Sequence, residues 1–216
     1  MIYYLIAFAT LIVAYLLGSI NFAVIFSSLF MKQDVRTMGS GNAGATNVLR
    51  NGGVLPGALT FICDALKGFV ASYIGYLVFG YMMHFTTWSF AIYGAYACGT
   101  ACMLGHVFPM FYQFKGGKGV ATSVGIFAVC CPIAIVIGLI AFVVVTLISR
   151  YVSLASIIAT VVVVSLSIYF YDIYASKYVQ MFFILAMGAI VILKHKTNIK
   201  RLLNGTESKI GKGGKK

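Results

Sequence analysis

Long apolar runs without a charged residue dominate this sequence and restrict it to a membrane. The first run, Tyr3 to Phe30, contains no Asp, Glu, Lys or Arg, and it exceeds the roughly 20 residues that a helix needs to cross a bilayer. Over the 216 residues, 61% are hydrophobic and 9% are charged, whereas soluble domains carry roughly 25% charged residues. Because the runs lack the alternation of barrel strands, we expect an all-α, polytopic integral membrane protein.

The chain is expected to form a single membrane domain over residues 1–216, because no polar segment is long enough to bury a core of its own. Residues 203–216 form a basic tail, and its end, GKGGKK, has the composition of a disordered segment that anionic lipid attracts. The N-terminus has no basic region and no clear cleavage site, so the first run is expected to be retained. The five cysteines lie within apolar runs and are expected to be reduced and buried.

The net charge of +12 does not indicate a nucleic-acid partner. The basic residues lie in short loops and in the tail, where the positive-inside rule places them on the cytoplasmic side of a membrane. Some of them are also suited to binding anionic lipid or an anionic substrate.

The run from Gly119 to Ile148 decides the topology. As one helix it would be about 45 Å long, well beyond the ~30 Å hydrocarbon core, and Pro132 interrupts it. We therefore expect a hairpin of two short helices in the middle of a seven-helix bundle. The expected spans are Tyr3–Phe30, Val54–Tyr81, Trp88–Val107, Gly119–Cys130, Pro132–Ile148, Ser153–Tyr171 and Tyr178–Leu193.

Seven spans also agree with the distribution of charge. They place Arg150 and the basic tail inside, so that the C-terminus is cytoplasmic and the N-terminus is outside. The loops that contain His84 and Asp172 are then external. With one span in place of the hairpin, the basic tail would lie outside.

Two polar groups inside the spans have a structural and a functional interpretation. Ser19 and Asn21 interrupt the first span and either pack helices together or face a site, with packing favoured. Asp64 and Lys67 lie three residues apart on one helix face. They form either an ion pair that fixes packing or a pair that also shapes a site.

The first of three polar segments is Met38 to Arg50, MGSGNAGATNVLR. Its glycines permit tight turns, and consecutive backbone N–H groups in such a loop can bind an anion. A helix that begins near Thr46 would direct its positive end at the same anion, and Arg50 adds a cation. The segment therefore predicts a phosphate site at the membrane surface.

The second polar segment contains Lys115-Gly116-Gly117-Lys118-Gly119 before a helix. Glycines let the backbone approach a phosphate, and lysines act as point charges on it. The segment is not a Walker A loop, because Gly119 stands where that motif requires Ser or Thr. The alternative is a basic turn that anchors a helix, and His106 either ends the third span or lies in the site.

The third polar segment follows the last span, on what we expect to be a continuation of the same helix. His195, Asn198 and Arg201 are spaced three apart and place an imidazole, an amide and a guanidinium on one face. Glu207 is the one acid in the tail. It is expected to orient a lysine or a loop, because phosphate repels an unpaired carboxylate.

The segments GSGNAGATNVLR, GHVFPMFYQFKGGKGVAT and HKTNIKRLLNGTE resemble the three signature segments of the PlsY family. The stretch DALKG, from Asp64 to Gly68, is also similar, and Ala43 departs from the proline of many members. The resemblance extends over nearly the whole chain. It implies a seven-helix membrane bundle with its N-terminus outside and its motifs on the cytoplasmic side.

The resemblance also implies an activity. Members of the family transfer an acyl group from acyl phosphate to the 1-hydroxyl of sn-glycerol 3-phosphate, giving lysophosphatidic acid and phosphate, the first step of bacterial phospholipid synthesis. It implies roles for Ser40 and Arg50, binding of glycerol 3-phosphate by Gly116 and Gly117, and a structural role for Glu207. The expected location is the bacterial cytoplasmic (inner) membrane.

The candidate site follows from the residues and the resemblance together. The proton acceptor is His195, His106 or a substrate phosphate, and either Lys115 or Lys118 contacts the glycerol phosphate. An acyl-enzyme on Ser40 is less favoured, because no histidine–carboxylate pair is evident beside it. The catalytic candidates are Ser40, Arg50, Lys115, His195 and Asn198; the binding candidates are Gly41, Asn42, Gly44, Ala45, Thr46, Asn47, His106, Gly116, Gly117, Lys118, Gly119, Thr122 and Arg201; and the site-shaping candidates are Asp64, Lys67 and Glu207.

No cofactor and no metal are expected, because no carboxylate cluster is present. The expected partners are the two substrates and membrane lipid, and the sequence is compatible with a monomer. Two rival classes are a transporter of a phosphorylated solute and a structural membrane subunit. The first would need polar residues through the external half of the chain, which has almost none, and the second would not need three site-like segments.

Overall fold

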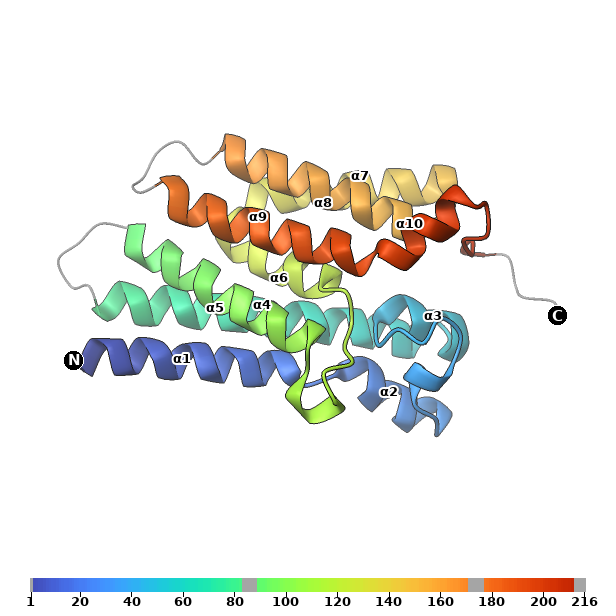
Figure 1. Cartoon of the computed structure of the whole chain (residues 1–216), viewed down its shortest axis with the longest axis horizontal. Coiled ribbons are helices and arrows are strands. Elements are labelled where there is room, and N and C mark those ends of the chain that lie inside the picture. Colours follow the sequence, from blue (N-terminus) through green and yellow to red (C-terminus); the bar gives the residue numbers. More distant parts are fainter. Residues whose placement is uncertain (1, 83–88, 171–176, 212–216) are drawn as a thin grey trace.

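The computed structural model describes residues 2–82, 89–170 and 177–211, and all regular structure in these ranges is helical. The long helices lie along a common direction, with Ile2 at one end of the bundle and α10 at the other (Figure 1). Two short 3₁₀ helices, η1 (Val35–Thr37) and η2 (Met110–Tyr112), lie in the connections. The α-helices are α1 (Ile2–Ser19), α2 (Phe22–Met31), α3 (Ala45–Gly52), α4 (Val54–Met82), α5 (Ser89–Val107), α6 (Val120–Cys130), α7 (Pro132–Ser149), α8 (Val152–Tyr169), α9 (Lys177–Lys194) and α10 (Lys196–Leu203).

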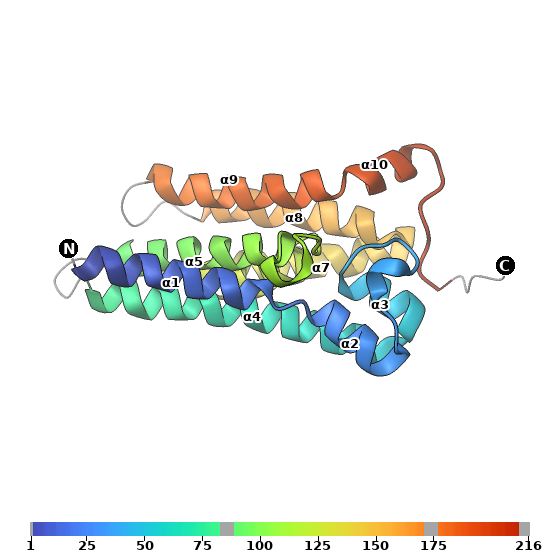
Figure 2. The same cartoon turned by 60° about the horizontal axis from the view of Figure 1, so that its bottom comes forward.

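The helices form two groups that pack against each other. Helices α1, α4 and α5 lie side by side with α6 against them, and α7, α8 and α9 form the second group, as two views of the molecule show (Figures 1 and 2). A buried cluster joins the groups and includes Met103 of α5, Phe127 of α6 and Met187 of α9. The main core therefore lies between the groups, and the outward faces carry exposed apolar side chains.

Small residues let helices of the first group approach at backbone distance. A Cβ placed on Gly125 of α6 would lie 1.8 Å from the carbonyl oxygen of Ala65 in α4. A Cβ on Gly75 would likewise lie 2.2 Å from the oxygen of Gly94 in α5. Contacts of this kind are typical of helices that associate in a membrane, where apolar side chains gain little by leaving lipid.

The all-α, multi-pass fold is confirmed. Five segments are long and apolar enough to cross a membrane, and the bent pair of α9 and α10 would be a sixth. Helix α6 has 11 residues and a length of about 16 Å, too short to cross a ~30 Å core alone. The count of seven spans and the external N-terminus stay predictions.

The break in the run from Gly119 to Ile148 lies where the sequence predicts it. Helix α6 ends at Cys130, and Pro132 occupies the first turn of α7, where its missing N–H costs no hydrogen bond. Helix α7 then packs chiefly on α8, while α6 packs chiefly on α4. The expected hairpin thus joins the two groups of helices.

The expected interruption of the first span is also present. Helix α1 ends at Ser19, and Asn21 caps α2 by accepting a hydrogen bond from the N–H of Val24 at 3.2 Å. Lys67 of α4 donates to the carbonyl oxygens of Gly18 and Ile20 at 2.9 and 2.7 Å. The backbone groups that the break exposes therefore have a partner inside the bundle.

The third polar segment does not continue the last span as a straight helix, so that expectation is wrong. Helices α9 and α10 meet at an angle of 53°, and His195 is the N-cap of α10. The bend directs α10 toward the start of α8, where Asn198 and Ser153 bind the same carboxylate. At the bend the ring of His195 takes the carbonyl oxygen of Val191, and the backbone N–H of His195 bonds to Ile192 instead, so the helical hydrogen-bond ladder is interrupted there.

Some sequence expectations lie outside the described residues. These are the external placement of His84 and Asp172, the start of the third span at Trp88 and the disorder of the last five residues. The described part of the tail makes defined contacts. The N–H of Ile210 donates to the carbonyl of Arg150 at 2.8 Å.

Candidate active site

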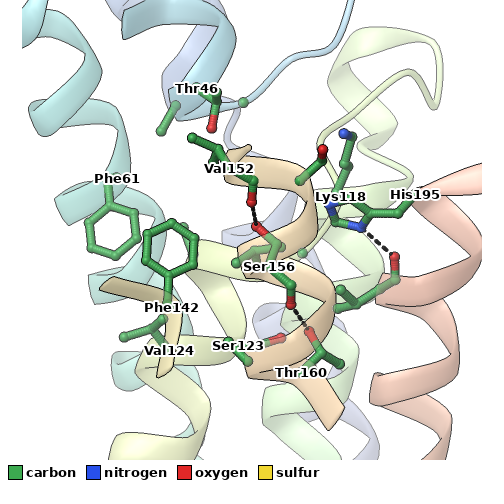
Figure 3. Close-up of a pocket in the computed structure, with 18 of the residues that line it drawn as sticks. Thr46, Phe61, Lys118, Ser123, Val124, Phe142, Val152, Ser156, Thr160 and His195 are labelled. Atoms are coloured by element: carbon green, nitrogen blue, oxygen red, sulfur yellow. Dashed lines mark hydrogen bonds between the residues drawn. The ribbon is translucent and has the colours of Figure 1, made fainter. Parts of the chain in front are cut away.

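A pocket opens between the two groups of helices near α3 and α10 (Figure 3). It contains about 1330 Å³ of space, part of it continuous with the surroundings. Its mouth is polar and its inner part is apolar. All three polar segments contribute to it, through Ser40, Asn42, Gly44, Ala45, Thr46, Asn47, Arg50, His106, Lys118, Gly119, His195, Asn198, Arg201 and Glu207, and Asp64 of α4 also lines it.

One side chain, Asn47, holds the glycine-rich loop in shape. Its Nδ2 donates to the carbonyl oxygens of Val35, Met38 and Asn42 at 2.9 to 3.1 Å, and its Oδ1 accepts from the N–H of Ser40 at 3.2 Å. Asn47 is 3% exposed, so these bonds lie in a poorly solvated place where they are costly to lose. Asn47 lines the pocket, but its amide is committed to the loop.

Helix α3 begins directly after this loop and presents its N-terminus to the pocket. Gly44 is the N-cap and supplies no side-chain cap, and the N–H groups of Ala45 and Thr46 have no acceptor among the described residues. Free N–H groups at a helix start attract an anion. Two turns on, the Nη2 of Arg50 donates to the carbonyl of Ser208 at 2.9 Å, and burial lowers the pKa of this guanidinium.

The first residues of several helices line the pocket. Besides α3, the starts of α6 and α8 line it, through Gly119 and Val120 and through Val152 and Ser153. Each end carries a partial positive charge from its unsatisfied N–H groups. These N–H groups add to the positive potential of the cationic side chains at the mouth.

The second polar segment approaches the pocket across His106. The N–H of Gly117 donates to the carbonyl of His106 at 3.1 Å, and a Cβ on Gly117 would lie 2.2 Å from the His106 Nε2. Only a residue without a side chain fits there. Next to it, Gly119 has a φ of +87°, and Lys118 between them extends its amine to the Oδ1 of Asn198.

A single carboxylate organises the third segment. Glu207 Oε1 accepts hydrogen bonds from Asn198 Nδ2 and Ser153 Oγ, each at 2.8 Å, and Oε2 accepts from Arg201 Nε at 2.7 Å. Burial opposes its ionisation, but the bonds from Arg201, Asn198 and Ser153 prevail and lower the pKa of Glu207. The carboxylate is therefore charged and fully engaged, as its predicted orienting role requires.

The lysine of this cluster has an unusual environment. Burial lowers the pKa of Lys118 to about 8, and nearby Arg201 and Arg50 add to that effect while Glu207 opposes it. The amine lies among cations with one carboxylate, itself already paired. Such a surplus of positive charge favours binding of an anion at this point.

The ring of His195 has a defined tautomer in its neutral form. Its Nδ1 lies 2.8 Å from the carbonyl oxygen of Val191 (Figure 3). Because a carbonyl only accepts, Nδ1 carries the hydrogen, which leaves Nε2 with a free lone pair. The residue is 2% exposed and lines the pocket, so it can act as a proton acceptor there.

A second buried polar cluster supports the pocket from α4. Asp64 Oδ1 lies 2.8 Å from Lys67 Nζ and 3.4 Å from His106 Nδ1. The expected ion pair is present, and Asp64 lines the pocket while Lys67 faces the α1–α2 break. Within the described residues, no group of three or more His, Cys, Asp or Glu is arranged to hold a metal.

Six predicted site residues do not line the pocket. Lys115 is exposed and lies outside it, so Lys118 is the lysine that the structure brings to Asn198. Thr122 is fully buried, and its carbonyl oxygen would lie 2.3 Å from a Cβ on Gly68, so it belongs to the α4–α6 contact. The other four are Gly41, Lys67, Gly116 and Gly117.

Sequence reasoning missed a row of hydroxyl groups on α8. Ser153, Ser156 and Thr160 all line the pocket, at spacings of three and four residues (Figure 3). Ser156 and Thr160 donate to the carbonyl oxygens of Val152 and Ser156 at 2.9 and 2.7 Å. The signal that could have identified them is this helical spacing of hydroxyl groups within an apolar span.

Comparison with known proteins gives consistent results over nearly the whole chain. The family model for glycerol-3-phosphate acyltransferase matches residues 8–205. A relative from Finegoldia magna named glycerol-3-phosphate acyltransferase is 41% identical, over 93% of this chain and 94% of the relative. A relative of the same name from a Thermoanaerobacter species is 44% identical, over 95% of this chain and 96% of the relative.

Two solved structures have the same fold. A crystal structure of PlsY (YgiH), an integral membrane glycerol 3-phosphate acyltransferase, in its glycerol 3-phosphate form superposes with a TM-score of 0.83. It is 38% identical and the match covers 95% of this chain and 96% of that one. The lysophosphatidic acid form of the same protein matches with a TM-score of 0.80, at 38% identity and over 95% of each chain.

Proposed function

Because this chain belongs to the glycerol-3-phosphate acyltransferase family, and is therefore a membrane acyltransferase, we propose that acyl phosphate is its donor. The chain transfers the acyl group to the 1-hydroxyl of sn-glycerol 3-phosphate and releases lysophosphatidic acid and phosphate. The observation that carries this proposal is one pocket with a cationic mouth and an apolar interior. Such a pocket suits a donor whose head is a phosphate and whose tail is a hydrocarbon chain.

Two phosphates require two sets of donors at the mouth. Lys118 and Asn198 are already in contact, and Arg50 lines the same pocket. The phosphate of glycerol 3-phosphate binds to these three side chains. The free N–H groups of Ala45 and Thr46, with the hydroxyls of Ser40 and Thr46, bind the phosphate of the donor. Glu207 and Asn47 position these groups and do not touch the reacting atoms.

The acceptor hydroxyl attacks the carbonyl carbon of the donor. A new C–O ester bond forms, the C–O bond to the phosphate breaks, and the hydroxyl proton ends on the released phosphate or on a protein base. The donor is already an activated anhydride, so no acyl-enzyme is needed. Alignment of the two substrates can supply roughly 7–11 kcal/mol, and donors aimed at the developing charge add several more.

Three groups can take the proton, as the sequence already indicates. His195 offers its Nε2, His106 lines the pocket against Gly117, and the phosphate of the donor is present in any case. The variants His195→Ala and His106→Ala distinguish them through the pH profile of kcat. Loss of the acid limb in one variant identifies the base, whereas an unchanged limb in both identifies the phosphate.

The pocket mouth belongs at the cytoplasmic face of a bacterial inner membrane. This placement is supported by the positive-inside rule, because Arg50, Lys118, Arg150 and Arg201 all lie at the α3–α10 end of the bundle. Glycerol 3-phosphate is a charged solute that reaches the site from the cytoplasm, and the donor reaches it within the membrane. The membrane face of the mouth is tested by replacing Lys196 with a single cysteine, in a variant without its native cysteines, and finding from which side of the membrane it is labelled.

The donor is tested with purified protein in detergent. We expect lysophosphatidic acid to form from glycerol 3-phosphate and acyl phosphate, with release of one phosphate per product. Acyl-coenzyme A and acyl carrier protein are the alternative donors and are expected to give no product. Transfer from acyl-coenzyme A without transfer from acyl phosphate would refute the proposed donor and leave the family assignment intact.

A further inference from the structure

The inner part of the pocket is apolar and is lined chiefly by α6, α7, α8 and α9. It continues from the polar mouth at His195 and Ser153 toward the middle of the bundle. Phe61 of α4 and Phe142 of α7 lie at its side (Figure 3). Its deeper lining includes Ile135, Leu139, Ala159, Val163, Met187 and Val191.

The inner end of this space is closed. Met187, Val163 and Ile135 line it and are 1%, 6% and 8% exposed. Ile184, about one turn from Met187 on α9, and Ala134, next to Ile135 on α7, are fully buried and do not line the pocket. The two belong to the same packed cluster as the residues above them, so the pocket ends on a solid floor.

The depth of the space is fixed by two helices. Met187 of α9 and His195, which directly follows that helix, are eight residues apart, which corresponds to about 12 Å. Ser153 and Val163 are ten apart along α8, about 15 Å. Helices α7 and α8 meet tightly at this level, since a Cβ on Gly138 would lie 2.3 Å from Val163 Cγ2. The floor therefore cannot recede without a change in helix packing.

We propose that this floor selects the length of the acyl chain, with Met187 and Ala159 as specificity-determining residues. The inference rests on the proposed function, because it assigns the inner space to the chain of the acyl donor. A chain that reaches the floor fills the space, and a longer one has to displace packed side chains. The donor starts in a membrane, so the selection comes from fit and not from leaving water.

The test is a series of straight-chain acyl phosphates of increasing length, assayed with purified enzyme. Met187→Ala lowers the floor, so the preferred chain becomes longer. Ala159→Leu fills the space above the floor, so the preferred chain becomes shorter. We expect the ratio of kcat/KM for long and short donors to change about fivefold or more in each variant, in opposite directions.

Two controls distinguish a change in chain-length specificity from a general loss of activity. Phe182→Ala removes an apolar side chain from α9 that is 66% exposed and outside the pocket, and this variant should keep the wild-type profile. The KM for glycerol 3-phosphate should be unchanged in all variants. If Ala159→Leu does not fold, Ala159→Val gives a smaller shift in the same direction.

The proposal is overturned if active Met187→Ala and Ala159 variants keep the wild-type length profile. A shift in Phe61→Ala or Phe142→Ala under the same conditions would then indicate that the chain leaves sideways, between α4 and α7. Failure of every acyl phosphate with the wild-type protein would instead refute the proposed donor. The two failures are therefore distinct.

Discussion

The pocket mouth has two walls, one at the start of α3 and one formed by Lys118 and α10. Both are suited to binding an anion, but by different physical means. On the α3 wall, the backbone provides the anion site, and a single neutral amide, Asn47, holds it in shape. On the α10 wall, charged side chains provide the site, and a single carboxylate, Glu207, holds them in place. A backbone site keeps its charge at any pH, whereas a side-chain site depends on protonation, so the two walls should respond differently to mutation and pH.

Arg50→Ala should have the largest effect, because it removes the one charged side chain that the α3 wall adds to its backbone donors. We expect kcat/KM to fall by roughly 10³, as when one partner of a buried, hydrogen-bonded charge pair is truncated. Lysophosphatidic acid formation measures it, and the thermal unfolding temperature reports folding. Lys196→Ala on α10, exposed and outside the pocket, is the matched control. Near-normal turnover by folded Arg50→Ala would refute its role.

Asn47→Ala tests whether the α3 wall depends on loop shape. The change removes the side-chain bonds to three carbonyl oxygens, at about 0.5–1.5 kcal/mol for each bond, while each oxygen keeps one backbone N–H partner. We expect kcat/KM to fall about 10²-fold together with a lower unfolding temperature. Asn51→Ala, which removes only bonds to Asn47 itself, should have a much smaller effect. Equal losses in both variants would contradict the central role of Asn47.

Lys118 makes the α10 wall sensitive to pH. Its pKa of about 8 in the free enzyme means that the amine is charged below pH 8 and neutral above it. We expect kcat/KM for glycerol 3-phosphate to decline above about pH 8, by up to tenfold per pH unit. Lys118→Arg keeps its charge at these pH values and should lose that alkaline limb, even if its activity is lower. An identical limb in the variant would assign it to another group.

Ser153→Ala should have the smallest effect. It removes one of the three hydrogen-bonding groups of Glu207 and leaves Asn198 and Arg201 in place. One such bond contributes about 1 kcal/mol, so we expect a change of roughly fivefold in kcat/KM. Thr10→Ala on α1, whose hydroxyl donates within its own helix and lies outside the pocket, is the control. A loss as large as that of Arg50→Ala would mean that Ser153 contacts substrate directly.

Much of the fold could be predicted because its determinants are local. The uncharged runs specify membrane helices, Pro132 specifies a break, and the total length between Gly119 and Ile148 excludes a single helix. The bend at His195 could not be predicted in this way. The segment there contains neither proline nor glycine, and the ladder is interrupted by a side chain, the ring of His195, which takes the carbonyl oxygen of Val191.

The sequence predicted which segments form the candidate site, but not always which of their side chains line it. Lys115 and Lys118 are equivalent in a sequence pattern, and only the backbone path around Gly117 and Gly119 directs one of them to Asn198. Thr122 lies on a predicted helix next to the glycines, but its face of α6 packs on α4. Which side of a helix meets a pocket depends on packing across the bundle, which short motifs do not record.

The hydrogen bonds that join the tail to the mouth have a consequence for the synthesis of this protein. Glu207 and Ser208 follow every membrane helix in chain order, yet they hold Asn198, Arg201 and Arg50. Insertion of the helices alone therefore leaves Asn198, Arg201 and Arg50 without the tail groups that they bind in the structure.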